Sequence, residues 1–370
     1  MKQGQSAEWS DWRWQLRNRL KTVDDFSGLI ELTEEEKAAL ESNQITFPTA
    51  VTPYYASLCD PKDPTCPIRR QAIPLPAEAR SYPFEHIDAL AEEEQSPVPF
   101  LVHRYPDRAL VIATQLCATY CRHCTRRRRV GLENVALTEQ DLERIREYLQ
   151  THEQIKDVII SGGDPLTLSD ERLVHIMDVI ASVPHVEIIR IGTRAPVTNP
   201  FRVTDELVQV LQGYPTVWVS THFNHPKEIT PEAREACTKL VNGGIPVLNQ
   251  TVLLAGINDS AEVQQELVRK LVQMKVQPYY LYQCDLVAGI EHFRTSPEVG
   301  LRIISALQGR TTGFAIPRFV IDAPGGGGKI PLEPRRIIKE TPTELYLQNY
   351  EGKCIRYPKK RFPTVCTGCM

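Results

Sequence analysis

The sequence predicts an α/β fold: a partial (β/α)6 barrel that follows a helical N-terminal segment and precedes a C-terminal extension. Short β-branched runs alternate six times with amphipathic segments from about residue 109 onward. Several of these segments begin with threonine or serine and then acidic residues, which is typical of helix N-termini. Strand–helix units in series require parallel strands with right-handed crossovers. Because six units are too few to close an eight-stranded barrel, we expect an open barrel, with a doubly wound sheet as the alternative.

The first hundred residues are predicted to form irregular turns and two helices, at 9–20 and 33–42, the second with Thr33 and Glu36 in capping-box spacing. Predicted strands lie at 109–113, 157–161, 186–191, 216–220, 246–254, 279–282 and 318–321. Predicted helices lie at 138–151, 169–182, 204–212, 230–242, 260–275 and 297–308. The predicted domains are a helical segment at 1–100, the barrel at 101–315, and a lysine-bearing loop with its extension at 316–370.

Composition narrows the classes of partner. The 370 residues include 43 Lys and Arg and 46 Asp and Glu, a formal net charge of −3. This balance does not indicate a dedicated nucleic-acid or membrane-surface binder. No run of about 18 apolar residues is present to span a bilayer. The first residues carry charges and tryptophans where a signal peptide needs an apolar stretch, so we expect a cytoplasmic protein.

Three of the ten cysteines, Cys117, Cys121 and Cys124, lie within eight residues after the first predicted barrel strand. In a chain that is expected to be cytoplasmic, cysteines are more often metal ligands, redox groups or buried thiols than disulfides. Three thiolates can hold three irons of a four-iron cluster and leave the fourth iron open to a ligand such as S-adenosylmethionine. The alternative is a structural zinc ion that His123 or a distant cysteine completes.

Two glycine-containing turns also follow predicted strands. The turn Ser161-Gly162-Gly163-Asp164 lets the backbone approach a bound methionine group, or is a simple tight turn. The run from Asp322 to Lys329 has four glycines, but no Ser or Thr follows its lysine, so the match to a phosphate loop is weak. It suits a lysine in a Schiff base with pyridoxal phosphate, with a flexible surface loop as the alternative.

Arginines flank these motifs. The run Arg126–Arg129 directly follows the cysteines, where at least one arginine is placed to clamp a substrate carboxylate. A solvated basic patch or a nucleic-acid contact is the alternative. Upstream, the segment His103–Arg108 offers two arginines and a phenol for a phosphate group, and simple packing would explain it equally well.

The motifs TQLCATYCRHCTRRR, SGGD, THFNHP, YQCDLVAGIEHFRT and VIDAPGGGGK occur in this order. With WSDWRWQLRNR near the start, they resemble the lysine 2,3-aminomutase family over nearly the whole chain. These are radical S-adenosylmethionine enzymes that also use pyridoxal phosphate. The resemblance implies a partial barrel of the radical S-adenosylmethionine type, a four-iron cluster on the three cysteines, and an internal aldimine at Lys329. It also implies an isomerase in which a 5′-deoxyadenosyl radical moves the α-amino group of L-lysine to the β-carbon, giving L-β-lysine.

The resemblance assigns further residues and partners. Those that would contact pyridoxal phosphate are Arg104, Tyr105, Arg108 and Lys329. Those around S-adenosylmethionine are His123, the turn Ser161–Asp164, His222 and Gln250. We also expect an external electron donor of the flavodoxin or ferredoxin type, and a homo-oligomer.

Substrate choice depends on three positions. By resemblance, Arg126 would bind the substrate carboxylate, while Asp285 and Asp322 would bind the distal ammonium group of lysine. Relatives that act on glutamate are understood to lack this acidic pair, because two carboxylates would repel the substrate's own. We therefore expect lysine, with arginine or ornithine as alternatives because a guanidinium group would satisfy the same charges.

The tail departs from the clostridial-type pattern, in which a C-terminal cysteine set and a cysteine after an Asn-Asp pair form a zinc site between subunits. Here Ser260 follows that pair, and the tail offers only Cys366 and Cys369, so a zinc site is left open. Two other functions are considered. One is a relative that isomerises a lysine destined for a translation factor; such relatives tend to be shorter at both ends. The other is a metal-containing nucleic-acid-binding module, which the net charge disfavours.

Overall fold

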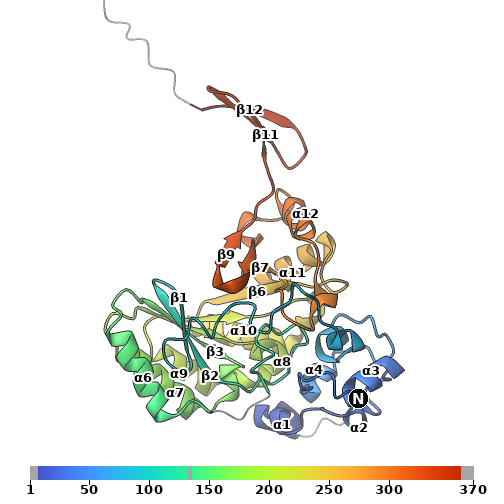
Figure 1. The fold of residues 1–370 in the computed structure, drawn as a ribbon, viewed down its shortest axis with the longest axis vertical. Helices are drawn as coiled ribbons and strands as arrows, with labels where there is room; N and C mark the ends of the chain where they lie inside the picture. Colours follow the sequence, from blue (N-terminus) through green and yellow to red (C-terminus); the bar gives the residue numbers. More distant parts are fainter. Residues whose placement is uncertain (1–6, 132–135, 360–370) are drawn as a thin grey trace, which may run out of the picture.

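A nine-stranded sheet organises the computed structural model, which describes residues 7–131 and 136–359 (Figure 1). Strands β2 to β8 pair in parallel, and β1 and β9 pair antiparallel at the two ends. The strands are β1 Leu101–Tyr105, β2 Arg108–Thr114, β3 Asp157–Gly162, β4 Ile188–Gly192, β5 Val217–Thr221, β6 Val247–Leu253, β7 Gln277–Gln283, β8 Arg318–Ala323 and β9 Gly328–Pro331. They lie side by side in sequence order. This order confirms the barrel and excludes the doubly wound alternative, in which the strand order reverses at the centre.

All six predicted helices are present between the parallel strands. They are α6 Glu139–Gln150, α7 Asp170–Ala181, α9 Asp205–Gln212, α10 Pro231–Asn242, α11 Ala261–Gln273 and α12 Pro297–Leu307, with a short α8 Ala195–Thr198 before α9. Thr138 and Asp141 form a capping box on α6, and Thr230 caps α10 ahead of Pro231. The helices begin where the sequence predicts because these side chains accept hydrogen bonds from free N–H groups of the first turn.

Alternate residues of a strand face either the helices or the inside of the sheet. In β3, Val158 and Ile160 are fully buried in the same core as Ile145 of α6. Ile159 and Ser161, in between and after them, line an internal cavity. The main apolar core therefore lies between sheet and helices, and the cavity lies within the curve of the sheet.

The sheet is larger than the strand pattern predicts. The last predicted strand is β8, which pairs in parallel with β7. Strands β1 and β9 were not predicted; β1 forms a hairpin with β2, and β9 returns along β8. β1 is five residues long and ends in His103-Arg104-Tyr105, and β9 is four residues long and begins with glycine, so neither shows the apolar alternation that identifies a strand.

The two ends of the chain differ from the barrel. The N-terminal segment has the short helices α1 Trp12–Arg17, α2 Val23–Phe26, α3 Glu34–Glu41, α4 Pro53–Ala56 and α5 Arg69–Ala72, so the predicted helix at 9–20 is reduced to α1 and a 3-10 turn before it. Strands β10 Ile337–Glu340, β11 Glu344–Gln348 and β12 Cys354–Pro358 form a separate antiparallel sheet that projects from the barrel (Figure 1). Cys366 and Cys369, the candidate zinc ligands, lie outside the described residues. In the described parts of the chain, no helix combines the length and apolarity needed to cross a membrane.

Side chains of β1 contact β8 and β9 at the opposite end of the sheet. The Lys329 backbone N–H on β9 donates to the Tyr105 hydroxyl on β1 at 2.9 Å. Arg104 on β1 forms an ion pair with Asp322 on β8 at 3.1 Å. These contacts nearly close the barrel, although β1 and β9 are not neighbours in the sheet order.

Candidate active site

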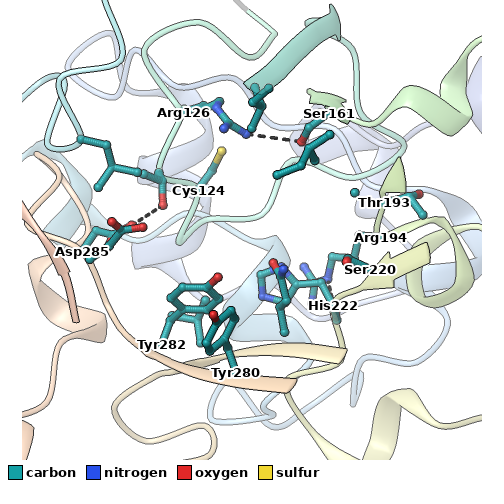
Figure 2. Close-up of a pocket in the computed structure, with 18 of the residues that line it drawn as sticks. Cys124, Arg126, Ser161, Thr193, Arg194, Ser220, His222, Tyr280, Tyr282 and Asp285 are labelled. Atoms are coloured by element: carbon teal, nitrogen blue, oxygen red, sulfur yellow. Dashed lines mark hydrogen bonds between the residues drawn. The ribbon is translucent and has the colours of Figure 1, made fainter. Parts of the chain in front are cut away.

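A cavity of about 480 Å³ lies inside the curved sheet and reaches the carboxyl ends of the parallel strands (Figure 2). All residues assigned above to cluster, cofactors or substrate line this one cavity: Arg104, Tyr105, Arg108, Cys117, Cys121, His123, Cys124, Arg126, Ser161, Gly162, Gly163, Asp164, His222, Gln250, Asp285, Asp322 and Lys329. The fold therefore gathers positions that are far apart in the sequence. Their individual roles stay predictions.

The cysteine loop, Cys117–Cys124, leaves the end of β2 and contacts the N-terminal segment. Arg19 donates from its guanidinium group to the Cys117 carbonyl oxygen at 2.7 Å. The Arg122 backbone N–H donates to the Gln71 carbonyl oxygen at 2.9 Å. Residues that precede the barrel thus hold the loop that carries the cysteines.

A buried ion triad supports the same loop. Glu78 accepts hydrogen bonds from Arg122 at 2.9 and 2.6 Å and from Arg127 at 2.7 Å. All three side chains are nearly inaccessible to solvent, and both guanidinium groups lie over the ring of Phe47. Burial alone would raise the pKa of Glu78, but the two arginines hold that pKa below its usual value. Glu78 therefore stays charged and ties the cysteine loop to the N-terminal segment.

The acidic segment 88–93 pairs with the other arginines of the run, Arg126, Arg128 and Arg129. Arg126 donates from Nε to both carboxylate oxygens of Glu92, at 2.9 and 3.0 Å. Its Nη1 atom lies 3.5 Å from the Ser161 hydroxyl (Figure 2). The run is thus paired within the protein, which argues against a solvated basic patch, and Nη1 of Arg126 is the part directed to the cavity turn.

The thiols of the loop fit a cluster better than a single metal ion. Within the described residues, no three Cys, His, Asp or Glu side chains converge as they would around one ion. This disfavours a zinc ion completed by His123, whereas the ligands of a four-iron cluster bind different irons and lie further apart. Burial raises the pKa of Cys124 to about 11 and that of Cys117 well above its usual value. Metal ions would compensate the buried thiolates.

The turn Ser161–Asp164 packs tightly against the end of β2 and the residues that lead into the cysteine loop. Gly162 has a φ of +117°, and a Cβ there would lie 2.3 Å from the Thr114 carbonyl oxygen. A Cβ on Gly163 would lie 2.4 Å from the Leu116 carbonyl oxygen. Both glycines are required because no side chain fits between the two segments.

Asp164 is buried and saturated by protein donors. One carboxylate oxygen accepts from the Leu166 N–H at 3.0 Å and the Thr193 hydroxyl at 2.6 Å. The other accepts from the Arg194 N–H at 2.8 Å. Its carboxylate therefore joins the turn after β3 to the end of β4, although the sequence suggested a contact with S-adenosylmethionine.

Polar residues at the ends of β4 and β5 also line the cavity and were not predicted: Thr193, Arg194, Ser220 and Thr221. The first three are labelled in Figure 2. Arg194 donates to the Cys121 sulfur at 2.6 Å. The Ser220 and Thr221 hydroxyls and Nε2 of His222 are buried without a hydrogen-bond partner among the described residues. Such atoms favour a polar ligand. Their position directly at strand ends is the sequence signal that would have identified them.

Lys329 lies in a group of charged and aromatic side chains. Its Nζ atom is 3.2 Å from one oxygen of Asp322, and the other oxygen of Asp322 is 3.1 Å from Arg104. The same Nζ lies 5.6 Å from the ring centre of Tyr105 and 5.7 Å from that of Tyr282. A primary amine between aromatic rings suits a planar carbonyl compound.

Asp285 follows β7 and has a different environment. One oxygen accepts a hydrogen bond from the Thr125 hydroxyl at 2.6 Å (Figure 2). Burial raises the pKa of Asp285 to about 6, and the negative charge of Asp322 contributes to the rise. No cation bonds directly to this carboxylate within residues 7–131 and 136–359. It is therefore an anion that is poorly compensated by the protein alone.

Comparison with known proteins identifies the family. A model described as Lysine-2,3-aminomutase matches residues 304–367, and one for the Radical SAM superfamily matches residues 111–265. The L-lysine 2,3-aminomutase of Fusobacterium nucleatum is 49% identical over 95% of this chain and 82% of its own length. The chain belongs to the lysine 2,3-aminomutase family. The L-lysine 2,3-aminomutase of Clostridium subterminale is 47% identical over 98% of this chain and 88% of its own, and a glutamate 2,3-aminomutase of Clostridioides difficile is 42% identical over 95% and 83%.

As a member of the lysine 2,3-aminomutase family, the chain is an isomerase and a radical S-adenosylmethionine enzyme. The family implies a four-iron cluster, S-adenosylmethionine, a small-molecule substrate and a reductant. The residues present fit the four-iron cluster and S-adenosylmethionine. Three cysteines line the cavity, and unpartnered buried polar atoms lie at the neighbouring strand ends.

Proposed function

We propose that this family member is an L-lysine 2,3-aminomutase that uses pyridoxal phosphate, and that it moves the α-amino group of lysine to the β-carbon. The observation that supports this most is the presence of two carboxylates, Asp285 and Asp322, and one guanidinium group, Arg126, around the cavity that the cysteines line. These are the charges needed to bind the distal ammonium and the carboxylate of a basic amino acid.

The residues around Lys329 fit pyridoxal phosphate. Lys329 supplies the amine for a covalent link, and the Tyr105 and Tyr282 rings flank it. Arg108 lies over the Tyr105 ring at 4.3 Å and, with Arg104, offers positive charge for a phosphate. When bound, the cluster with S-adenosylmethionine supplies the hydrogen-abstracting radical, and pyridoxal phosphate carries the migrating amino group.

Charge balance explains why a cationic side chain is preferred. Asp322 pairs with two cations, Arg104 and Lys329, in the protein alone. A covalent link from Lys329 to pyridoxal phosphate would replace the free ammonium group that pairs with Asp322 in the protein alone. The acidic pair then gains room for an incoming ammonium group. A glutamate side chain at the same place would instead face Asp285 at close range, which costs free energy.

Further predictions concern partners. An electron donor of the flavodoxin or ferredoxin type and assembly into a homo-oligomer stay predictions. The exposed apolar residues Ile337, Ile338, Ile355 and Tyr357 of the projecting sheet support a contact with another chain.

An anaerobic assay tests the proposed function. The reconstituted protein, with S-adenosylmethionine, pyridoxal phosphate and a reductant, is incubated separately with lysine, arginine, ornithine and glutamate. We expect β-lysine from lysine and little turnover of glutamate. Turnover of glutamate in preference to lysine, or no amino-group migration in any substrate, would contradict the proposal.

A further inference from the structure

Three consecutive residues, Cys124, Thr125 and Arg126, line the cavity and contact different parts of it. Cys124 lies with the other cysteines, and Arg126 pairs with Glu92 and reaches toward Ser161. Thr125, between them, donates its hydroxyl hydrogen to Asp285 at 2.6 Å across a separation of 160 residues (Figure 2). The segment that carries the cysteines therefore also contacts the carboxylate at the end of β7.

The Thr125 contact fixes the orientation of Asp285. Within the described chain, the Thr125 hydroxyl is the one group that hydrogen-bonds to this carboxylate, and it engages only Oδ2. The carboxylate is half-buried at the cavity wall, where few groups besides Thr125 reach it. With Oδ2 held, Oδ1 is the oxygen available to a ligand in the cavity.

We propose that Thr125 is a positioning residue for substrate selection: its hydroxyl holds Oδ2 of Asp285, so that Oδ1 receives the distal ammonium group of the amino-acid substrate. This inference rests on the proposed function, because it needs a cationic substrate. Because Thr125 directly follows Cys124, the segment that carries the cysteines would then also help to select the cationic substrate. A substrate with the same chain length but no distal charge gains nothing from Thr125.

The experiment compares lysine with norleucine, which has the same carbon chain but lacks the distal ammonium group. Binding is followed by the change in pyridoxal phosphate absorbance when either amino acid is added to protein that has the cofactor but not the cluster. The variants are Thr125→Val, which removes the hydroxyl at nearly constant volume, and Thr125→Ser, which keeps it. Loss of one hydrogen bond to a charged group predicts a roughly 10- to 100-fold higher Kd for lysine in Thr125→Val. We expect norleucine binding to stay unchanged and Thr125→Ser to restore lysine binding.

A matched control lies on the other side of the cavity. Thr193 donates to the buried Asp164 at the same distance of 2.6 Å, but that carboxylate also accepts hydrogen bonds from two backbone N–H groups. We expect Thr193→Val to leave the ratio of the lysine and norleucine Kd values unchanged. If Thr193→Val weakens the binding of a ligand, we expect that ligand to be S-adenosylmethionine.

The outcomes separate this inference from the function on which it rests. If the wild-type protein binds lysine no better than norleucine, the proposed function is refuted, and this inference with it. If the wild-type protein prefers lysine and Thr125→Val keeps that preference, only the role of Thr125 is refuted. An equal weakening of lysine and norleucine would show that Thr125 has a merely structural role, and would also refute it. Because the titration does not need the cluster, a variant that loses iron still gives an answer.

Discussion

Two aspartates that line the cavity, Asp164 and Asp285, differ in how many hydrogen bonds the protein donates to their carboxylates. Asp164 and Asp285 each accept a threonine hydroxyl at 2.6 Å. Asp164 also accepts two backbone N–H groups, whereas Asp285 accepts no other hydrogen bond within the described residues. Both carboxyl pKa values are raised by burial, that of Asp285 to about 6.

The difference separates a carboxylate that supports the fold from one that is directed at a ligand. The donors of Asp164 come from the turn after β3 and the end of β4, so its removal affects the shape of the site. The free oxygen of Asp285 is completed only when something positive enters the cavity. Four predictions test this contrast between the side of Asp164 and the side of Asp285.

The largest expected effect is at Lys329. Replacement by alanine removes the covalent attachment point and should lower turnover by roughly a thousandfold or more. The residues around Asp164 should be unaffected, so we expect the iron content and S-adenosylmethionine binding to stay at wild-type levels. Borohydride reduction and peptide mapping give the check. A pyridoxal–lysine adduct at another residue of the variant would show that the wrong lysine has been chosen.

The second effect concerns the support of the cysteine loop. Glu78→Gln breaks the buried triad with Arg122 and Arg127 and should lower the free energy of unfolding by about 3–5 kcal/mol. The control is Glu36→Gln, since Glu36 forms a buried, two-bond pair with Arg69 that does not touch the loop. Both variants should lose stability in chemical denaturation, but only Glu78→Gln should also lose iron per folded chain. Equal iron contents in the two variants would contradict the assignment.

The third prediction compares the two aspartates directly. Asp285→Asn should cost about 2–5 kcal/mol in kcat/KM for lysine, because the ammonium loses its charged partner. Folding raises the pKa of Asp285, so its protonated form stabilises the fold and that contribution is lost as the pH rises through about 6. The variant should therefore be no less stable than wild type at neutral pH.

Asp164→Asn should behave in the opposite way. An amide cannot accept on both sides, so one N–H group is left unsatisfied at a cost of about 1–3 kcal/mol in unfolding free energy. The check is to measure the melting temperature and the kcat/KM for lysine of both variants. The contrast fails if Asp285→Asn is the less stable protein.

The smallest effect is the pH dependence of lysine binding. Only the carboxylate form of Asp285 attracts an ammonium group, and the pKa of that group in the free protein is about 6. Affinity for lysine, relative to norleucine, should be constant above this pH and fall by up to about tenfold per pH unit below it. The Asp285→Asn variant should lack the inflection. A wild-type ratio that is flat from neutral pH down to well below 6 would place the titrating group elsewhere.

Much of the fold is determined by local sequence. Thr138 with Asp141, and Thr230 with Pro231, set the starts of α6 and α10 through contacts within one turn. The parallel strands β2 to β8 follow from short apolar and β-branched runs, which are typical of strands buried in a parallel sheet. Strands β1 and β9 could not be predicted in this way, because they are short edge strands whose pairing depends on β2 and β8.

The location of the site also follows from the sequence. The cysteine, Ser161–Asp164, Asp285 and Asp322 motifs each begin at the carboxyl end of a predicted strand, and parallel strands bring these ends to the same edge. Cys117, Ser161 and Asp285 therefore meet in one cavity for a reason that a single sequence contains.

Only the tertiary structure decides which charges are paired. Arg104 and Lys329 share Asp322, although Arg104 precedes both by more than 200 residues. Glu78 accepts hydrogen bonds from Arg122 and Arg127, and Asp285 accepts one from Thr125. The physical reason is that an ion pair or hydrogen bond depends on distances of about 3 Å between side-chain atoms, which no local pattern of residues encodes. The sequence alone thus determines where chemistry takes place, and the packing of distant segments determines which of its groups are left free for a ligand.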